Sequence, residues 1–424
     1  MWKPLAAVAA LALVPCAYAQ VPAPAVPLTL DAAIERVAQD HPALGWVDAR
    51  RPALEAGRTL AAVTPPLQLG VTVEDVFGTG QARALRAMET TVTLSGVIER
   101  GGKLDARRLL AQANLDALAP QRATARLDLM AETARRYLAI ARAQADLRVA
   151  ELDITQRQRA VDAARARLRA GASPESVLFT AQAQLAQAEL DRDRALQSAQ
   201  GAGVALAALW GGRGADVGRV SGDVLLLPDV VPLEVLAQTL DASPELAEVM
   251  GQQRIAQAQL QLAQADAAPD WSWQLGLRGN RADNDVAWVA GVSVPLGLRA
   301  RAAPAISMAQ AQLAAVPFQQ QALQRQLYAT LADAHGRYVG ARLEVLRLEQ
   351  DVVGKLQRAE QAAQRAWQLG AASYMEWAQL QAMRVDVHRR QVDSAAAAQA
   401  ALIEIQRLTG RALLADAPTQ EMSR

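Results

Sequence analysis

The side chains that most often bind metals or act as nucleophiles are scarce in this chain of 424 residues, which has three histidines and one cysteine. His41, His335 and His388 lie far apart and share no spacing that is typical of metal ligands, so we interpret each as a surface or helix-face residue. The sequence contains neither a glycine-rich phosphate loop nor a nucleophile motif. We therefore expect no enzyme, no metal site and no cofactor.

The charged side chains are abundant but balanced. Lys plus Arg number 44 and Asp plus Glu number 43, so no net field attracts nucleic acid or an anionic membrane. On helices, carboxylates most often lie in water beside nearby arginines. We accordingly interpret the arginine-rich segment from Arg157 to Arg169 as a solvated face of a coiled coil.

Three tryptophans occur in segments where apolar and polar residues alternate. Trp271, Trp273 and Trp288 lie near the ends of such segments, as tryptophans do at a membrane–water interface. Alternation of this kind indicates strands. The four expected strands are residues 67–77, 88–98, 271–279 and 286–296.

Each expected strand has about 9–11 residues, a length that crosses a bilayer when the strand is tilted. Four strands cannot close a barrel in lipid, because open edges leave unpaired backbone amides. If these strands lie in a membrane, several chains must therefore share one barrel, and two, three or four chains would supply eight, twelve or sixteen strands. Two hairpins packed on helices in a soluble α+β domain are the alternative.

Two long helical hairpins are expected to carry these strands. Apolar residues seven apart precede a turn at Gly171, as in the seam of a coiled coil. A matching series precedes Gly370, roughly 199 residues later, and only Glu360 interrupts it. Residues 103–170 would form one helix of roughly 100 Å, with a possible kink at Pro120.

The N-terminus has the features of a secretory signal peptide: Lys3, an apolar segment, and a small-residue cleavage site that ends at Ala19. A lipid anchor at Cys16 is the alternative. The expected organisation is a signal peptide (1–19), a first repeat (20–212, helical hairpin about 103–210), a connector (213–232), a second repeat (233–410, helical hairpin about 301–409) and a tail (411–424). After the signal, no segment is long and apolar enough for a transmembrane helix.

The order of two short helices, a strand hairpin and a long helical hairpin, present twice, resembles the TolC-type outer-membrane efflux protein family. The most specific motifs are Gly171-Ala172-Ser173 with Gln182 eleven residues on, and Gly370-Ala371-Ala372 with Gln381 eleven residues on. The segments 74–80 and 94–103 are similar to the CzcC-like branch, which serves heavy-metal efflux.

This resemblance implies a mainly α-helical homotrimer with a shared 12-stranded barrel in the outer membrane and a helical tunnel in the periplasm. It also implies a periplasmic adaptor, or membrane fusion protein, and an inner-membrane resistance–nodulation–division pump as partners, besides outer-membrane lipid. The expected function is passive conduction of substrate across the outer membrane, with heavy-metal cations as the leading substrate. A drug-efflux duct, a type I secretion duct and a periplasmic coiled-coil adaptor without a pore remain alternatives.

Members of this family close their tunnel at the periplasmic end, where the hairpin turns converge. The positions that are acidic in the best-known pattern are here Glu376 and Gln379. In a trimer, Glu376 would form a ring of three carboxylates that favours cations, or it is an ordinary exposed glutamate. Tyr374, Met375 and Trp377 are candidates for a constriction or an adaptor contact, or else they pack between helices. The candidate adaptor contacts at the turns are Gly171, Ala172, Ser173, Gly370, Ala371 and Ala372.

Overall fold

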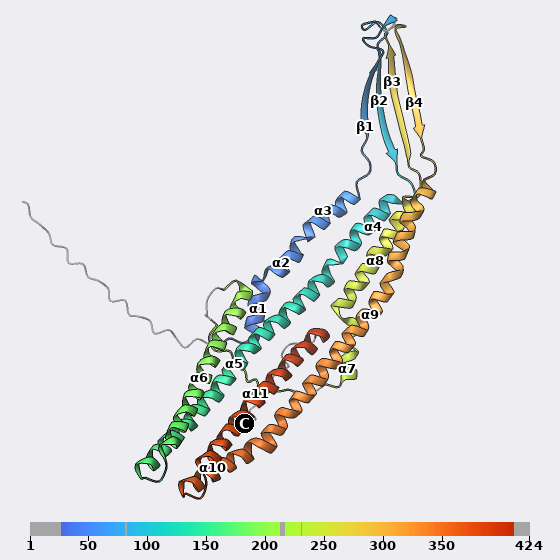
Figure 1. The fold of residues 1–424 in the computed structure, drawn as a ribbon. Helices are drawn as coiled ribbons and strands as arrows, with labels where there is room; N and C mark the ends of the chain where they lie inside the picture. Colours follow the sequence, from blue (N-terminus) through green and yellow to red (C-terminus); the bar gives the residue numbers. More distant parts are fainter. Residues whose placement is uncertain (1–26, 81–82, 213–216, 230, 411–424) are drawn as a thin grey trace, which may run out of the picture.

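The protein is long and narrow, with a four-stranded sheet at one end and long helices beneath it (Figure 1). This computed structural model describes residues 27–80, 83–212, 217–229 and 231–410. The expected signal peptide, Cys16 within it, and the tail from residue 411 lie outside these ranges.

The sheet joins the two halves of the chain. Its strands are β1 (Gln68–Glu74), β2 (Glu89–Ile98), β3 (Trp271–Asn280) and β4 (Asp285–Ser293), all antiparallel in the order β1-β2-β3-β4. Each expected hairpin is present, and β2 pairs with β3 to connect them. β1 is shorter than expected because Asp75 and Phe77 adopt left-handed backbone angles that end the strand.

The register places apolar residues from all four strands on one face. Val71 lies opposite Val92, which lies opposite Leu277, which lies opposite Trp288. The neighbouring row consists of Leu69, Leu94, Leu275 and Ala290. The other face carries mostly polar residues and glycine, and the apolar face has no covering layer among the described residues (Figure 1).

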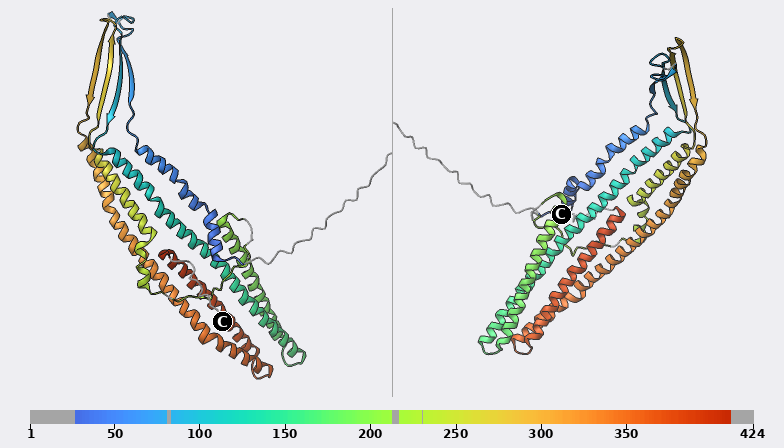
Figure 2. Two further views of the ribbon diagram at one scale, coloured as in Figure 1. Left: turned by 180° about the vertical axis from the view of Figure 1, so that it is seen from behind. Right: turned by 45° about the horizontal axis from the view of Figure 1, so that its top comes forward.

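The helices form a layer below the sheet (Figures 1 and 2). Near the sheet α3, α4, α8 and α9 lie side by side, and farther away α6, α5, α11 and the α9–α10 pair do so. The bounds are α1 (Leu30–Asp40), α2 (Pro42–Ala49), α3 (Arg51–Ala61), α4 (Lys103–Asp116), α5 (Leu118–Arg169), α6 (Glu175–Ala207), α7 (Leu233–Ala237), α8 (Pro244–Ala265), α9 (Leu298–Arg347), α10 (Gly354–Gln368) and α11 (Tyr374–Thr409). With 52 residues, α5 extends over roughly 78 Å.

The two long helices are interrupted in different ways, the first of them near Pro120 as expected. The first breaks at Ala117, between α4 and α5, because Pro120 has no N–H for the carbonyl of Asp116. The second continues through Pro317 without a break but contains a π-helical turn, η4 (Leu348–Val353), before α10. The sequence showed the proline but not the π-helical turn.

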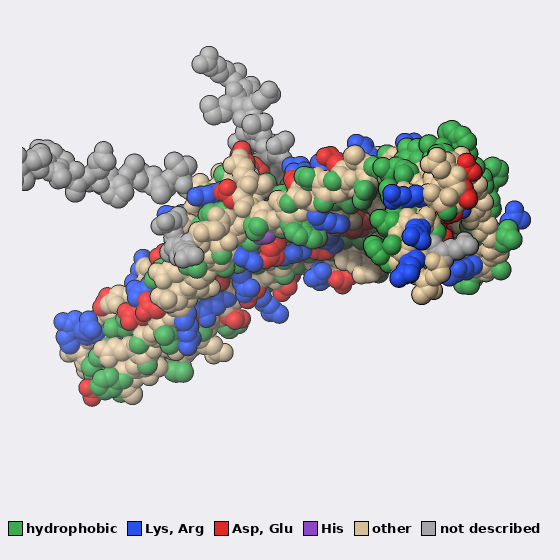
Figure 3. Space-filling model, turned by 90° about the horizontal axis from the view of Figure 1, so that it is seen from above, with side chains coloured by type: hydrophobic (Ala, Val, Ile, Leu, Met, Phe, Trp, Pro, Cys, Tyr) green, Lys and Arg blue, Asp and Glu red, His purple; other side chains and the backbone are tan. Residues whose placement is uncertain are grey.

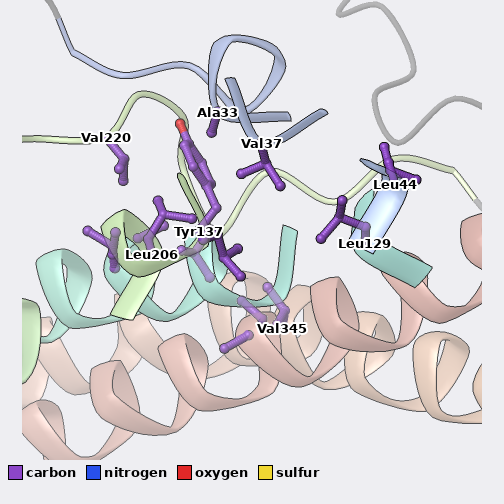
Figure 4. Close-up of a cluster of buried hydrophobic side chains, with 14 residues drawn as sticks. Ala33, Val37, Leu44, Leu129, Tyr137, Leu206, Val220 and Val345 are labelled. Carbon is purple, nitrogen blue, oxygen red and sulfur yellow. The ribbon is translucent and has the colours of Figure 1, made fainter. Parts of the chain in front are cut away.

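Around the middle of the helices, the connector and α1 pack on the helical layer. Tyr137 of α5 contacts a cluster formed by Val37 of α1, Leu206 of α6, Val220 of the connector and Val345 of α9 (Figure 4). The cluster fixes the chain segments that cross the helices. Among the described helices, none combines the length and apolar character that a bilayer crossing needs.

Equivalent tyrosines in the two halves tie these crossing segments to the helices. The Tyr137 hydroxyl donates to the carbonyl oxygen of Leu28 or that of Ser221, at 2.8 and 2.7 Å. The Tyr338 hydroxyl of the second half donates to the carbonyl oxygen of Pro228 at 2.6 Å. The duplication therefore extends to individual hydrogen bonds.

Replacing either tyrosine by phenylalanine should weaken this attachment. Because Tyr137→Phe or Tyr338→Phe leaves a part-buried carbonyl oxygen without its donor, we expect a loss of about 1–3 kcal/mol. Hydrogen exchange of the amides around residues 28 and 220 should be faster in the first variant. Tyr328→Phe is the control, because Tyr328 is half exposed; an equal effect there would contradict the prediction.

Candidate functional site

The two hairpin turns lie side by side at the end of the molecule farthest from the sheet (Figure 1). Each places its glycine in the left-handed region, with φ +67° at Gly171 and +80° at Gly370. In both turns the following alanine donates its N–H to a carbonyl five residues earlier, at 2.9 Å for Ala172 and 2.8 Å for Ala371. Both helices thus end in the same hydrogen-bonded motif, which favours glycine.

Arg167 connects the two turns. Its guanidinium donates to the backbone carbonyl of Trp367 and, at 3.2 Å, to that of Ala172. It also lies over the Trp367 ring, 5.1 Å from its centroid. One side chain of the first hairpin therefore positions the end of the second.

An aromatic cluster lies behind the second turn. The rings of Trp367 and Trp377 stack at 5.0 Å, and Tyr374 meets both edge to face. Tyr374 and Trp377 are both buried within the chain. Burial at this position favours packing between helices over a constriction of the tunnel.

The other predicted gate residues face outward. Glu376, Gln379 and Met375 are exposed on α11, and the Glu376 N–H caps the helix start by donating to the Ser373 hydroxyl at 3.2 Å. At helical spacing, Asp386 lies on the same stripe as Glu376 and Gln379 and is also exposed. Asp386 was not among the residues expected at the gate, although its helical spacing from Glu376 could have indicated it.

A buried polar network lies between the hairpins, a few turns from the gate. Arg157 donates to Asp153 at 3.0 Å, to Gln184 at 3.0 Å and to Gln381 at 3.4 Å. The Tyr374 hydroxyl donates to Gln184 at 3.0 Å. Burial raises the pKa of Asp153, and the positive charge of Arg157 opposes that rise. The solvated face predicted for Arg157 to Arg169 is therefore wrong at Arg157, which is buried.

The residue that interrupts the apolar series of the second half is also buried and paired. Glu360 lies 2.5 Å from Arg384, and both side chains are largely shielded from water. A buried ion pair could have been predicted from Glu360, because an acidic residue there occupies a position of the coiled-coil seam that is otherwise apolar. The sequence did not identify its partner.

The three predicted interface tryptophans all lie on the apolar face of the sheet. Trp271 and Trp273 are at the end of β3 that adjoins the helices, and Trp288 lies in β4 opposite Leu277. Apolar side chains gather at the sheet end of the molecule, while acidic and basic side chains are interspersed along the helices (Figure 3). Such a distribution is typical of a protein that has one part in lipid and another part in water.

Comparison with known proteins agrees with this architecture. Residues 33–212 match the family model described as outer membrane efflux protein. The cobalt-zinc-cadmium resistance protein CzcC of Cupriavidus metallidurans is 28% identical over 270 residues, which are 64% of this chain and 63%, less than two thirds, of that protein. Crystal structures of CusC align with a TM-score of 0.76 at 17% identity, over 91% of this chain and 92% of theirs. The outer membrane protein VceC of Vibrio cholerae aligns with a TM-score of 0.74 at 21% identity, over 91% and 97% of the two chains.

A sheet with one apolar face, placed above two tandem helical hairpins, is the fold of a TolC-type channel subunit. Residues 33–212 of the chain match the outer membrane efflux protein family. This match and the fold place the chain in the outer membrane, with a helical extension in the periplasm, and the matched family is not a class of enzymes.

Proposed function

We propose that three copies of this chain form a passive outer-membrane channel, the exit duct of a tripartite efflux system. Each chain supplies four strands to a shared 12-stranded barrel, and the helices continue as a tunnel through the periplasm. The observation that carries this proposal is the sheet: its apolar face is exposed, and β1 and β4 each have one unpaired edge among the described strands. In lipid such edges must pair, and the neighbouring copies provide the partners. The number three comes from the resemblance to the family.

The partners proposed are a periplasmic adaptor and an inner-membrane pump. The two turns at Gly171–Ser173 and Gly370–Ala372 are the proposed adaptor contacts, because they form the tip farthest from the sheet. The proposed substrate is a heavy-metal cation, supported by the similarity to CzcC, a cobalt-zinc-cadmium resistance protein. The pump supplies energy and most of the selectivity, while the duct conducts.

The oligomer is tested by purification in detergent. We expect a trimer that separates into monomers on heating and that conducts ions in planar bilayers. A water-soluble monomer without conductance would contradict the channel and favour a periplasmic coiled-coil adaptor.

The substrate is tested separately by deleting the gene. Sensitivity should rise for zinc, cobalt and cadmium and stay constant for a panel of drugs. Increased sensitivity to drugs alone would assign the duct to drug efflux.

The gate is tested by charge removal. In a trimer, Glu376 contributes three carboxylates near the tunnel end, so Glu376→Gln should shift the reversal potential in a salt gradient toward zero. The shift should be larger in dilute salt, because the Debye length falls from about 30 Å at 0.01 M to about 3 Å at 1 M. Glu175→Gln removes another exposed carboxylate, beside the other turn, and is the control. Identical reversal potentials for Glu376→Gln and wild type would remove the gate role.

A further inference from the structure

The place where the sheet meets the helices carries a local excess of basic residues. We name this region the junction belt and define it as residues 58–63, 98–109, 262–273 and 294–302, which surround the base of the strands (Figure 1). These segments contain seven basic and four acidic residues, although the whole chain has a net charge of only +1. The loops at the far end of the sheet, residues 74–89 and 278–285, contain four basic and five acidic residues. The excess therefore belongs to one end of the sheet.

Two of the four carboxylates in the junction belt are already paired within the chain. Asp270 lies 2.7 Å from the ammonium group of Lys103. Glu99 accepts a hydrogen bond from Arg107 at 2.8 Å, and this bonding holds the pKa of the Glu99 carboxyl below its ordinary value. Lys103 and Arg107 are thus paired, and five basic residues remain in the junction belt against two acidic residues.

The remaining basic side chains of the belt face water. They are Arg58, Arg100, Arg108, Arg299 and Arg301. The exposed carboxylates of the belt are Asp105 and Asp266. The ion pair between Asp105 and Arg108, at 3.5 Å, is itself solvated and therefore weak. At least three guanidinium groups per chain are thus available to an external anion.

Apolar side chains occur in the same segments as these arginines, at the base of the apolar face of the sheet. Ile98 and Trp271 are register partners at the base of the apolar face, and Leu296 beyond β4 is 91% exposed. The Arg100 guanidinium lies 4.5 Å from the Trp271 ring centroid, and its backbone N–H donates to Asp270 at 3.1 Å. An order of apolar residue, tryptophan and arginine along one surface is typical of the boundary between hydrocarbon and lipid headgroups.

We propose that the junction belt binds the phosphate groups of anionic glycerophospholipids in the periplasmic leaflet of the outer membrane. This inference rests on the proposed function, because it requires the sheet in the membrane and the helices in the periplasm. The planar guanidinium group matches phosphate oxygens with two parallel hydrogen bonds. Close to an anionic surface each arginine strengthens binding by about fivefold. Arg100, Arg299 and Arg301 carry the site, since Arg100 lies over the Trp271 ring and the other two follow the exposed Leu296 by three and five residues.

The test uses the full mature chain in nanodiscs of equimolar phosphatidylethanolamine and phosphatidylglycerol. The lipid that remains bound after detergent extraction is quantified by headgroup. We expect phosphatidylglycerol to be enriched around the wild type and the enrichment to fall by about fivefold or more in Arg100→Gln/Arg299→Gln/Arg301→Gln. The matching lysine variant, which keeps the charge but lacks the two parallel hydrogen bonds of a guanidinium group, should retain only part of the enrichment.

The matched control is Arg83→Gln/Arg86→Gln/Arg281→Gln, which removes three exposed arginines from the opposite end of the sheet. It should retain the wild-type preference for phosphatidylglycerol. Loss of the preference in this control would show an effect of net charge alone and overturn the assignment to the junction belt.

Two further results separate this inference from the channel proposal. Equal retention of both lipids by a wild type that forms trimers and conducts would overturn the lipid site and leave the channel intact. A wild type that enters neither the nanodiscs nor a planar bilayer would refute the channel, and the lipid site with it. Inorganic phosphate is the second arm: stabilisation of the detergent-solubilised protein by phosphate, without a lipid preference, would assign the arginines to a soluble anion and overturn the inference.

Discussion

Arginine in place of Val71 is expected to keep the chain from assembling in the outer membrane. Val71 lies in the middle of β1, is 62% exposed, and shares its row of the apolar face with Val92, Leu277 and Trp288. A lipid-facing arginine at the midplane of a barrel costs about 2–4 kcal/mol. Because a trimer carries three copies, the total cost is about 6–12 kcal/mol if the three copies add. Heat-sensitive trimers should disappear from the membrane fraction.

The neighbouring residue provides the control. Thr72 is also exposed, but its side chain points to the opposite, polar face of the sheet. Thr72→Arg should therefore assemble in the membrane and alter only conduction through the barrel. Normal trimers of both variants, or the loss of both, would contradict the assignment of the two faces.

The strands could be predicted because their determinants are local. Alternation of apolar and polar residues requires no knowledge of distant parts of the chain, and it indicated all four strands. The pairing of β2 with β3 lay beyond this reasoning, since it joins residues about 180 positions apart, such as Ile98 and Trp271. The apolar pattern nevertheless restricted the register, because a shift by one residue would mix the two faces.

Less of the candidate site could be predicted from the sequence, because several of its contacts join residues that are far apart in the chain. Glycines at the two turns and the position of Glu376 follow from local sequence, and the structure places these residues at one end of the molecule. The prediction of a solvated Arg157 is wrong although its neighbours on the helix include exposed arginines such as Arg159. Its burial depends on Gln381, which is 224 residues away. Helix-face patterns cannot reveal which charged residue faces a second hairpin.

The buried network also carries a large expected effect on stability. Removing Arg157 by substitution with methionine leaves Asp153 buried without its cation, and breaking a buried pair in this way costs about 3–5 kcal/mol. The local opening of α5 and α6 should become easier, so amides around residues 150–164 should exchange about a hundredfold faster or more. Arg159→Met changes an exposed arginine of the same helix and should alter stability by less than about 0.5 kcal/mol. Similar exchange in the two variants would show that burial of the network contributes little.

The pH dependence of stability should show whether the buried Asp153 carboxylate causes the destabilisation of Arg157→Met. Its pKa is raised in the folded chain, so the folded state binds a proton more tightly than the unfolded state, and stability rises as the pH falls through the folded pKa. Removal of the opposing Arg157 charge should raise that pKa further and move the window toward neutral pH. The defect of Arg157→Met should therefore be largest near neutral pH and shrink on acidification. Asp153→Asn/Arg157→Met, which has no buried charge at this position, should lose the pH dependence; a defect that is constant with pH in both variants would assign the loss to packing instead.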